Sequence, residues 1–238
     1  MELIHTFSNG IKVYDRHLIP VQRERYKKNN VHEAEEEEVF LNYVHAIPEN
    51  GCFVNIGAAI GYYCLLAKKV SASLRVHAFE PLQMHYDYFS ENILLNGFQP
   101  SDFHIYLEGV SSQAGQVSFL NRRYGSRIQI SKEGLDDQIS EAEDVSLIQV
   151  ITLNQLVEKV GGYVDLLQMD VQSLETKILR GGTDTLKKQL VKRFIIGTHR
   201  EKIHQSCIAL LEKFSYKIEV DNYETVDQAD GILCAVAV

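Results

Sequence analysis

The chain has no tryptophan, only four prolines and four cysteines, and no apolar run of membrane length among its 238 residues. A transmembrane helix needs about 20 consecutive apolar residues, so we expect no membrane partner. The cysteines stand apart in apolar stretches without any C-x-x-C pair. This pattern predicts buried thiols in a reducing compartment, not disulfides or zinc ligands. The first residues also lack the basic and apolar regions of a signal peptide, so the expected location is cytoplasmic.

Positive charge is scarce as well. Lys and Arg number 24 against 32 Asp and Glu, which gives a formal net charge of −8. This excess of acidic residues argues against a nucleic-acid partner, although the net charge does not exclude a local basic patch. The hydrophobic fraction of 45% and the length of the chain suit one substantial α/β domain with a full core.

The most informative stretch indicates a strand, a glycine turn and a helix in succession. Residues 52–56 are apolar and rich in β-formers, Gly57 and Gly61 bracket a turn, and residues 62–70 follow helical spacing. Glycine at such a turn lets a ligand approach the backbone, and the helix start offers free N–H groups. Such units build nucleotide sites at the carboxyl ends of parallel strands, although a plain strand-to-helix connection would have a similar pattern.

The spacing of the glycines narrows the choice of ligand. A dinucleotide site needs G-x-G-x-x-G and a P-loop ends in Gly-Lys-Ser/Thr, whereas here Gly57 and Gly61 enclose three other residues and Tyr62 follows. A nucleoside without a pyrophosphate remains, and S-adenosylmethionine is the common one. The next predicted strand, residues 75–79, ends in Glu80-Pro81. A carboxylate about 20 residues beyond such a turn can hold a ribose.

Alternating strand and helix patterns predict a mainly parallel sheet with helices on both faces. We divide the chain into an accessory segment with a leading helix, residues 1–48, and a ligand-binding domain, residues 49–238. The leading helix is expected from an N-cap at Asn30 to about Ile47, and a capping box at Thr152 begins a short helix. Residues 111–149 are interpreted as a β-hairpin excursion with a polar loop near residues 132–146. Further strands are predicted at residues 103–110, 163–169, 193–197, 216–221 and 232–238, and further helices at residues 82–95, 174–179 and 201–214.

Four stretches of the chain form a recognisable set. They are Val54-Asn-Ile-Gly-Ala-Ala-Ile-Gly-Tyr-Tyr63, His77-Ala-Phe-Glu-Pro81 with Glu91-Asn92, Asp165-Leu-Leu-Gln-Met-Asp-Val-Gln-Ser-Leu-Glu175 with Leu179-Arg-Gly181, and Ile196-Gly-Thr-His199. Over about residues 50–220 the chain resembles the FkbM-type methyltransferases, a branch of the class I S-adenosylmethionine-dependent enzymes. The resemblance implies a single Rossmann-like domain with a seven-stranded sheet whose last strand runs antiparallel.

The resemblance also assigns roles to particular residues. The turn of Gly57 and Gly61 would hold the methionine part of S-adenosylmethionine, Glu80 would bind the ribose hydroxyls, and Asp170 would lie at the mouth of the active site. Residues at the end of the third strand would lie near the adenine. The full expected cofactor set is Asn55, Ile56, Gly57, Gly61, Tyr62, Glu80, Pro81, Gly109, Val110, Ser111 and Asp170.

The chain departs from the family pattern at four positions. The family has Asp where this chain has Asn55, Lys at Gln168, and Glu-Gly at Gln172-Ser173. Asn55 can still accept a hydrogen bond from the cofactor's amino group, but it contributes no charge. The change at Gln172 and Ser173 bears on the substrate side of the site.

His199 and Asp170 are the candidate catalytic residues, because both directly follow predicted strands and open onto the same edge of the sheet. Methyl transfer to a hydroxyl needs a base, and histidine titrates near neutral pH. We therefore predict His199 as the base and Asp170 as the residue that orients it or the acceptor. The alternative is that His199 caps the following helix or bonds a loop. Two candidate ligands do not make a metal site, so no metal is predicted.

Aromatic and polar side chains ahead of the domain are expected to cover the acceptor site, namely Tyr14, Arg25, Tyr26 and His32. Simple packing of a leading helix across the sheet edge is the alternative.

The sequence thus predicts an S-adenosylmethionine-dependent methyltransferase that acts on a hydroxyl of a small molecule, a natural product or a sugar. Two other classes stay open: an enzyme that methylates nitrogen or a macromolecule, and a binding module that has lost catalysis. The departures at Asn55, Gln168 and Gln172 favour the last class. The oligomeric state is open, with a homodimer as one candidate.

Overall fold

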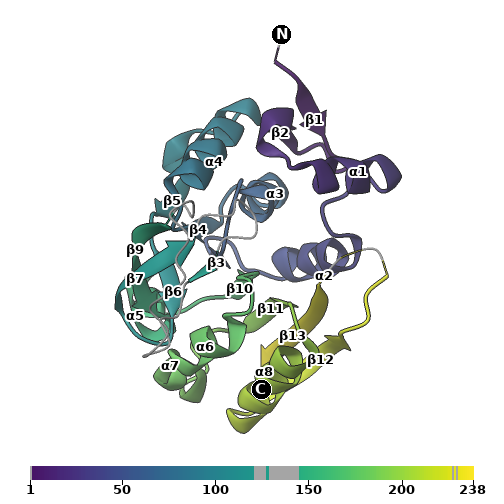
Figure 1. Ribbon diagram of the computed structural model, residues 1–238. Coiled ribbons are helices and arrows are strands. Elements are labelled where there is room, and N and C mark those ends of the chain that lie inside the picture. The colour runs from purple at the N-terminus through teal and green to yellow at the C-terminus, as the bar shows by residue number, and fades with distance from the viewer. Residues whose placement is uncertain (1, 121–126, 129–144, 227, 229) are drawn as a thin grey trace, which may run out of the picture.

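The structure is a computed structural model, and it describes residues 2–120, 127–128, 145–226, 228 and 230–238 (Figure 1). A seven-stranded sheet forms its centre, in the order β12-β13-β11-β10-β3-β4-β5. The strands are β3 (Cys52–Ile56), β4 (Arg75–Phe79), β5 (Phe103–Tyr106), β10 (Leu166–Met169), β11 (Arg193–Thr198), β12 (Tyr216–Asn222) and β13 (Gly231–Ala237). Only β13 runs antiparallel to its neighbours, so the expected topology is confirmed.

Helices cover both faces of this sheet, which explains why its central strands β3 and β10 are buried along their whole length. Phe53 of β3 packs on one side, with its ring centroid 5.2 Å from that of Phe40, and Val54 packs on the other. The first side is covered by α2 (Ala34–His45), α3 (Tyr62–Val70) and α4 (Gln83–Leu95). The second is covered by α5 (Leu153–Lys159), α6 (Glu175–Arg180), α7 (Thr183–Lys187) and α8 (Glu201–Lys213).

The N-terminal segment folds onto the first side of the sheet, where Figure 1 shows it beside α3 and α4. It contains β1 (Ile4–Thr6), β2 (Lys12–Tyr14), a 3₁₀ turn (Asp15–His17) and α1 (Pro20–Lys28). The side chain of Asn96, the C-cap residue of α4, bonds both backbone groups of Lys12, and Phe7 and Ile11 are buried in the same core as α3. The boundary at residue 48 stays a prediction, although this shared core ties the segment to the domain.

A second, smaller sheet corrects the prediction of one strand at residues 103–110. That stretch divides into β5 and β6 (Gly109–Ser111), because β6 leaves the central sheet and pairs in parallel with β9 (Val145–Thr152). The remaining strands of this sheet are β7 (Gly115–Leu120) and β8 (Arg127–Ile128). The predicted β7–β8 hairpin is confirmed, whereas the long strand β9 was not predicted. Residues 132–144 of the predicted polar loop lie outside the described residues.

The leading helix begins later than its sequence predicts. Asn30 was expected to cap it, but α2 starts at Ala34, and the Asn30 side chain donates instead to the carbonyl of Thr6 at 2.9 Å. A tertiary contact with β1 therefore takes the side chain that local sequence assigns to the cap. The capping box at Thr152 is confirmed, since its hydroxyl accepts from the Gln155 N–H at 3.2 Å.

The glycine turn generates a stability prediction. Gly61 has φ of +85°, and a Cβ there would lie 1.9 Å from the Phe89 ring on α4. Left-handed backbone costs an alanine about 1–2 kcal/mol, and overpacking costs about 1–3 kcal/mol more. We therefore expect Gly61→Ala to lower the free energy of unfolding by about 2–5 kcal/mol, measured by urea denaturation.

Gly97 provides the matched control for this substitution. Its φ of +79° is nearly the same, but a Cβ there would meet no atom within 4 Å. Gly97→Ala should therefore cost only the backbone term of about 1–2 kcal/mol. Equal losses for the two variants would show that the contact with Phe89 does not matter.

Candidate active site

A cavity of about 350 Å³ lies beyond the carboxyl ends of β3, β4 and β10, within the usual range of small-molecule sites, about 300–1,000 Å³. The predicted cofactor residues that line it are Asn55, Ile56, Gly57, Tyr62, Glu80, Pro81, Gly109, Val110 and Asp170. Gly61 and Ser111 are not among the described residues of its lining. Nine of the eleven residues that were expected to bind the cofactor therefore line one cavity.

The structure gives the two turn glycines a reason that differs from the expected one. A Cβ on Gly57, at φ +79°, would lie 2.3 Å from the carbonyl oxygen of Asp170. Gly61 lies against Phe89 in the same way. Both glycines are therefore needed because other parts of the protein pack closely on them, and only Gly57 also faces the cavity.

Glu80 lines the cavity, and its carboxylate is held by two backbone N–H groups and one histidine ring nitrogen. Its Oε2 accepts from the N–H of Ala59 at 2.9 Å, and Oε1 accepts from the N–H of Leu82 at 3.0 Å. The Nδ1 atom of His85 lies 3.2 Å from Oε1. A carboxylate has about four lone-pair sites, so Oε2 keeps an acceptor position for a ligand hydroxyl.

Two of the departures from the family pattern lie directly beside one another. Asn55 and Gln168 are register partners on β3 and β10, and the Asn55 amide donates to the side-chain oxygen of Gln168. Gln168 in turn donates to Oε1 of Glu36 at 2.8 Å. Burial, followed by the charge of Asp170, raises the pKa of Glu36 to about 8. The pair of neutral amides therefore forms one connected network at the base of the cavity.

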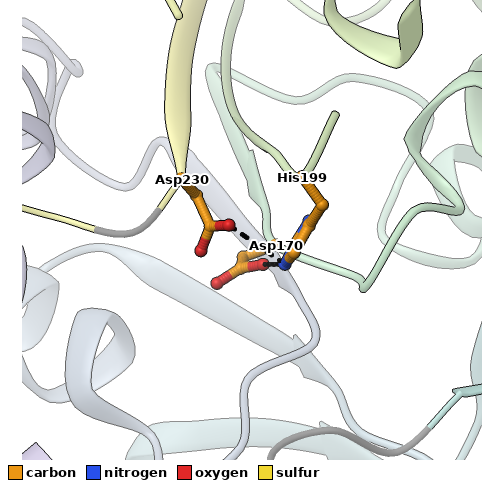
Figure 2. Close-up of side chains that lie close together, drawn as sticks. All are labelled: Asp170, His199 and Asp230. Carbon is orange, nitrogen blue, oxygen red and sulfur yellow. Dashed lines mark ion pairs between the residues drawn. The ribbon is translucent and has the colours of Figure 1, made fainter. Parts of the chain in front are cut away.

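The side chains of His199 and Asp170 converge, as Figure 2 shows, and Asp170 lines the cavity. The Nε2 atom of His199 lies 3.2 Å from Oδ1 of Asp170 and 2.8 Å from the side-chain nitrogen of Gln172. Its Nδ1 lies 2.7 Å from Oε1 of Glu175, a residue with no exposed surface. The helix-capping alternative for His199 is not observed, because α8 has Arg200 at its N-cap without a side-chain hydrogen bond.

The charges around His199 change its protonation. Burial lowers the pKa of the ring, but the hydrogen bond to Glu175 and the charges of Asp170 and Asp230 outweigh it and raise this pKa to about 9. Burial also raises the pKa of Asp170 to about 6, against the opposing effect of His199. At neutral pH the ring thus holds both protons, and Nε2 must lose its proton before it can act as a base.

Asp230 was missed by sequence reasoning, although its Oδ1 lies 3.5 Å from Nε2 of His199 (Figure 2). It directly precedes β13, and β13 runs antiparallel to β11. The start of β13 therefore lies at the same sheet edge as the end of β11. A search for acids before the antiparallel strand would have found Asp230.

The end of β11 is held by a second histidine. The Thr198 hydroxyl lies 2.7 Å from Nδ1 of His204, and Nε2 of His204 lies 2.8 Å from Oδ1 of Asp221. His204 has no exposed surface, so it serves as a packing residue that ties β11, α8 and β12 together. This anchor fixes the backbone from which His199 projects.

Of the four residues predicted to cover the acceptor site, two line the cavity and two do not. Arg25 and His32 line the cavity, together with Glu33, whose carboxylate is 3.7 Å from the Arg25 guanidinium. Tyr26 is buried behind them, with its hydroxyl 2.6 Å from Nδ1 of His32. Tyr14 does not line the cavity and bonds Asn92 on α4 through its backbone.

The fold is similar to that of solved methyltransferases. A Thermotoga maritima S-adenosylmethionine-dependent O-methyltransferase superimposes with a TM-score of 0.51 at 15% identity, covering 99% of this chain and 77% of that one. A Geobacter metallireducens precorrin-6y C5,15-methyltransferase gives 0.50 at 11% identity, covering 87% and 89%. Both similarities concern the fold alone.

The family itself follows from the sequence comparison. The FkbM methyltransferase domain matches residues 55–218, so the chain belongs to this family and is an S-adenosylmethionine-dependent methyltransferase. A curated relative, Methyltransferase sdnD of Sordaria araneosa, is 26% identical over 220 residues, covering 79% of this chain and 83% of that protein. The family prediction is confirmed. Among the described residues, no helix is long and apolar enough to cross a membrane.

The cofactor role of Glu80 can be tested by calorimetry with S-adenosylmethionine. Charge-assisted hydrogen bonds to two ribose hydroxyls should contribute about 2–3 kcal/mol, so Glu80→Ala should weaken binding about 30–150-fold. Glu108→Ala, at an acid that pairs with Lys159 and does not line the cavity, is the control.

Glu80 also bonds the backbone of Ala59 and Leu82, so the melting temperature of each variant must be recorded. If Glu80→Ala remains folded and binds the cofactor as tightly as the wild type, Glu80 does not contact the ribose.

Proposed function

We propose that this methyltransferase transfers the methyl group of S-adenosylmethionine to a hydroxyl of a small molecule, a natural product or a sugar. The observation that supports this proposal is the convergence of Asp170 and His199, whose side-chain atoms lie 3.2 Å apart at the rim of the cavity. An acceptor hydroxyl placed there would lie next to both groups and next to the glycine turn.

The chemistry is an in-line displacement on the sulfonium methyl group. The acceptor oxygen attacks the methyl carbon while the carbon–sulfur bond breaks, and S-adenosylhomocysteine leaves. The hydroxyl proton passes to the pair of Asp170 and His199. Because the leaving group is already activated, most of the protein's contribution is positioning, to which a base adds about 10²–10⁴-fold.

A small acceptor fits the way in which the N-terminal segment borders the cavity. Ile19, Gln22 and Arg25 of this segment line it, as do His32 and Glu33 ahead of α2. Arg25 is the one Arg or Lys among the described residues of the lining. A macromolecular acceptor, above all a nucleic acid, would favour an open, basic rim instead.

The departures from the family pattern, which favoured an inactive binding module, are weaker support for that alternative once their contacts are considered. Asn55 and Gln168 form a hydrogen bond with each other. The two departures from the family pattern therefore belong together, because a neutral Asn–Gln pair replaces the family's charged Asp–Lys pair. Gln172 still contacts His199 at 2.8 Å, in the place of the family's Glu. These contacts support the proposal of an active enzyme over that of an inactive module.

The acceptor class can be determined with methyl-labelled S-adenosylmethionine. The full chain is incubated with a panel of hydroxyl acceptors and a matched panel of amines. We expect label only in the hydroxyl panel, as a base-stable ether. Label in amines would favour N-methylation, and label in neither panel, with the cofactor bound, would favour the inactive module.

His199→Ala should lower turnover of a hydroxyl acceptor roughly 10²–10⁴-fold, because this is the usual contribution of general acid–base catalysis. Cofactor affinity should stay within a few-fold, because His199 is not among the described residues of the cavity lining. His45→Ala, at an exposed histidine on α2, is the matched control and should retain full turnover. A His199→Ala enzyme with wild-type turnover would contradict the catalytic role.

The lid proposal is best tested by point substitution, since deletion of residues 1–30 would remove Phe7, Ile11 and Val13 from the core. Arg25→Ala should raise the KM for the acceptor about 10-fold or more, because hydrogen bonds to charged groups contribute about 1.5–3 kcal/mol. Cofactor affinity should not change. Lys27→Ala, at an exposed residue of α1, should leave both constants unaltered. An unaltered KM in Arg25→Ala would favour simple packing of α1.

A further inference from the structure

We propose that Asp170, His199 and Asp230 bind a divalent metal ion at the rim of the cavity. The three side chains come from three places in the sequence, the turn after β10, the turn after β11 and the residue before β13. One ligand atom from each lies within 4.8 Å of the other two. Figure 2 shows both carboxylates directed at the same edge of the imidazole ring.

The distances fit coordination by one ion. Ligand atoms about 2.1 Å from a metal are separated by about 3.0 Å at adjacent octahedral positions and about 3.4 Å at tetrahedral ones. The observed separations from Nε2 of His199 are 3.2 Å to Asp170 and 3.5 Å to Asp230. Both separations from Nε2 therefore suit neighbouring positions around one ion, and all three ligand atoms lie within 4.8 Å of one another.

The imidazole is already oriented as a metal ligand. Its Nδ1 is 2.7 Å from Oε1 of Glu175, and this directs Nε2 toward the two aspartates. A carboxylate behind a ligating histidine is the usual arrangement in metal sites, because it fixes the ring and raises its basicity. Glu175 has no exposed surface, so its carboxylate cannot turn to solvent instead.

Asp170 supplies a second, independent observation. Its Oδ1 is shielded from solvent and has no hydrogen-bond partner among the described residues, although His199 is within ion-pair distance. A buried carboxylate oxygen without a hydrogen bond is costly unless something else satisfies it. A cation in the position just described would be bonded to this oxygen.

Asp230 is held in place by its own loop. Its carbonyl accepts from the Gln228 side chain at 2.9 Å and from the Thr225 hydroxyl at 3.1 Å. Gln228 also accepts from the N–H of Glu36 at 3.2 Å, which ties the loop to α2. These bonds hold the backbone from which the Asp230 carboxylate projects.

Two carboxylates and one imidazole suit a borderline or hard divalent ion such as Mn²⁺, Mg²⁺ or Zn²⁺, and they leave coordination positions open. The Nε2 proton would leave to solvent on binding, because histidine binds metals as the neutral ring. Asp170 and Asp230 line the cavity, so an open position would face a bound acceptor oxygen. Use of the ion to acidify a hydroxyl rests on the proposed function, whereas binding of the ion does not.

The test is titration of the full chain, stripped with a chelator, with Mn²⁺ by electron paramagnetic resonance and with Zn²⁺ by calorimetry. We expect one saturable site per chain. Loss of an outer partner alone weakens metal sites about 10–100-fold, so Asp170→Asn and Asp230→Asn should each weaken binding by at least that factor. Asp184→Asn, at an exposed acid on α7, should bind as the wild type does.

The outcomes separate this proposal from the proposed function. Absence of saturable binding of both ions to the wild type, or equal affinity in Asp230→Asn, overturns the metal site. If turnover then continues in the presence of chelator, O-methylation stands without a metal. If the ion binds and the two Asn variants lose it while no hydroxyl acceptor is methylated, the metal site stands and the proposed acceptor class fails.

Discussion

Strand β3 is buried on both faces, with Phe53 packed against α2 and Val54 among residues of α5 and α6. Its register with β10 sets Ile56 beside Met169, and the chain must then turn within a few residues at both strand ends. Gly57 allows this, because a Cβ there would clash with the Asp170 carbonyl oxygen at 2.3 Å. The cavity, the glycine turn and the position of Asp170 all depend on this close packing of two strand ends.

Glu175 has the corresponding role beside His199. Its Oε1 lies 2.7 Å from Nδ1 of His199 and accepts from the N–H of Ser173 at 3.2 Å. One buried carboxylate thus joins the turn after β10 to the residue after β11. Burial of such a group is unfavourable unless its partners are fixed, and here the partners are themselves part of the site. The charge of Glu175 also supports the positive charge of His199.

The turn after β10 shows how a departure from the family pattern is tolerated. Gln172 and Ser173 have φ of +51° and +74°, and the family has glycine at the second position. Left-handed backbone costs a residue with a side chain about 1–2 kcal/mol, which the bonds of the turn offset. In return Gln172 reaches His199, and its amide can orient either way toward Nε2. The altered turn keeps the site assembled.

The sequence by itself determined the central strands, most of the helices and the glycine turn. Residues 52–56 and 75–79 are short runs with several apolar β-forming residues, and such runs predict buried strands. This pattern can be recognised from neighbouring residues alone. Nine of the eleven residues expected to bind the cofactor line one cavity, because they lie at the ends of such strands or were matched to the family pattern. Asp170 and His199 were predicted to lie close together for the same reason, since strands that run parallel end at one edge, and their side chains do lie 3.2 Å apart.

Only the tertiary structure decided the features that depend on long-range contacts. The contact between Asn30 and Thr6 displaced the start of α2, and pairing with β9 drew β6 out of the central sheet. Neither partner is close in sequence, so no local pattern could show them. Asp230 joined the site because β13 returns antiparallel beside β11, and the protonation of His199 follows from the three acids that surround it. The sequence determines which groups lie at strand ends, and the packing of distant segments decides which of them meet.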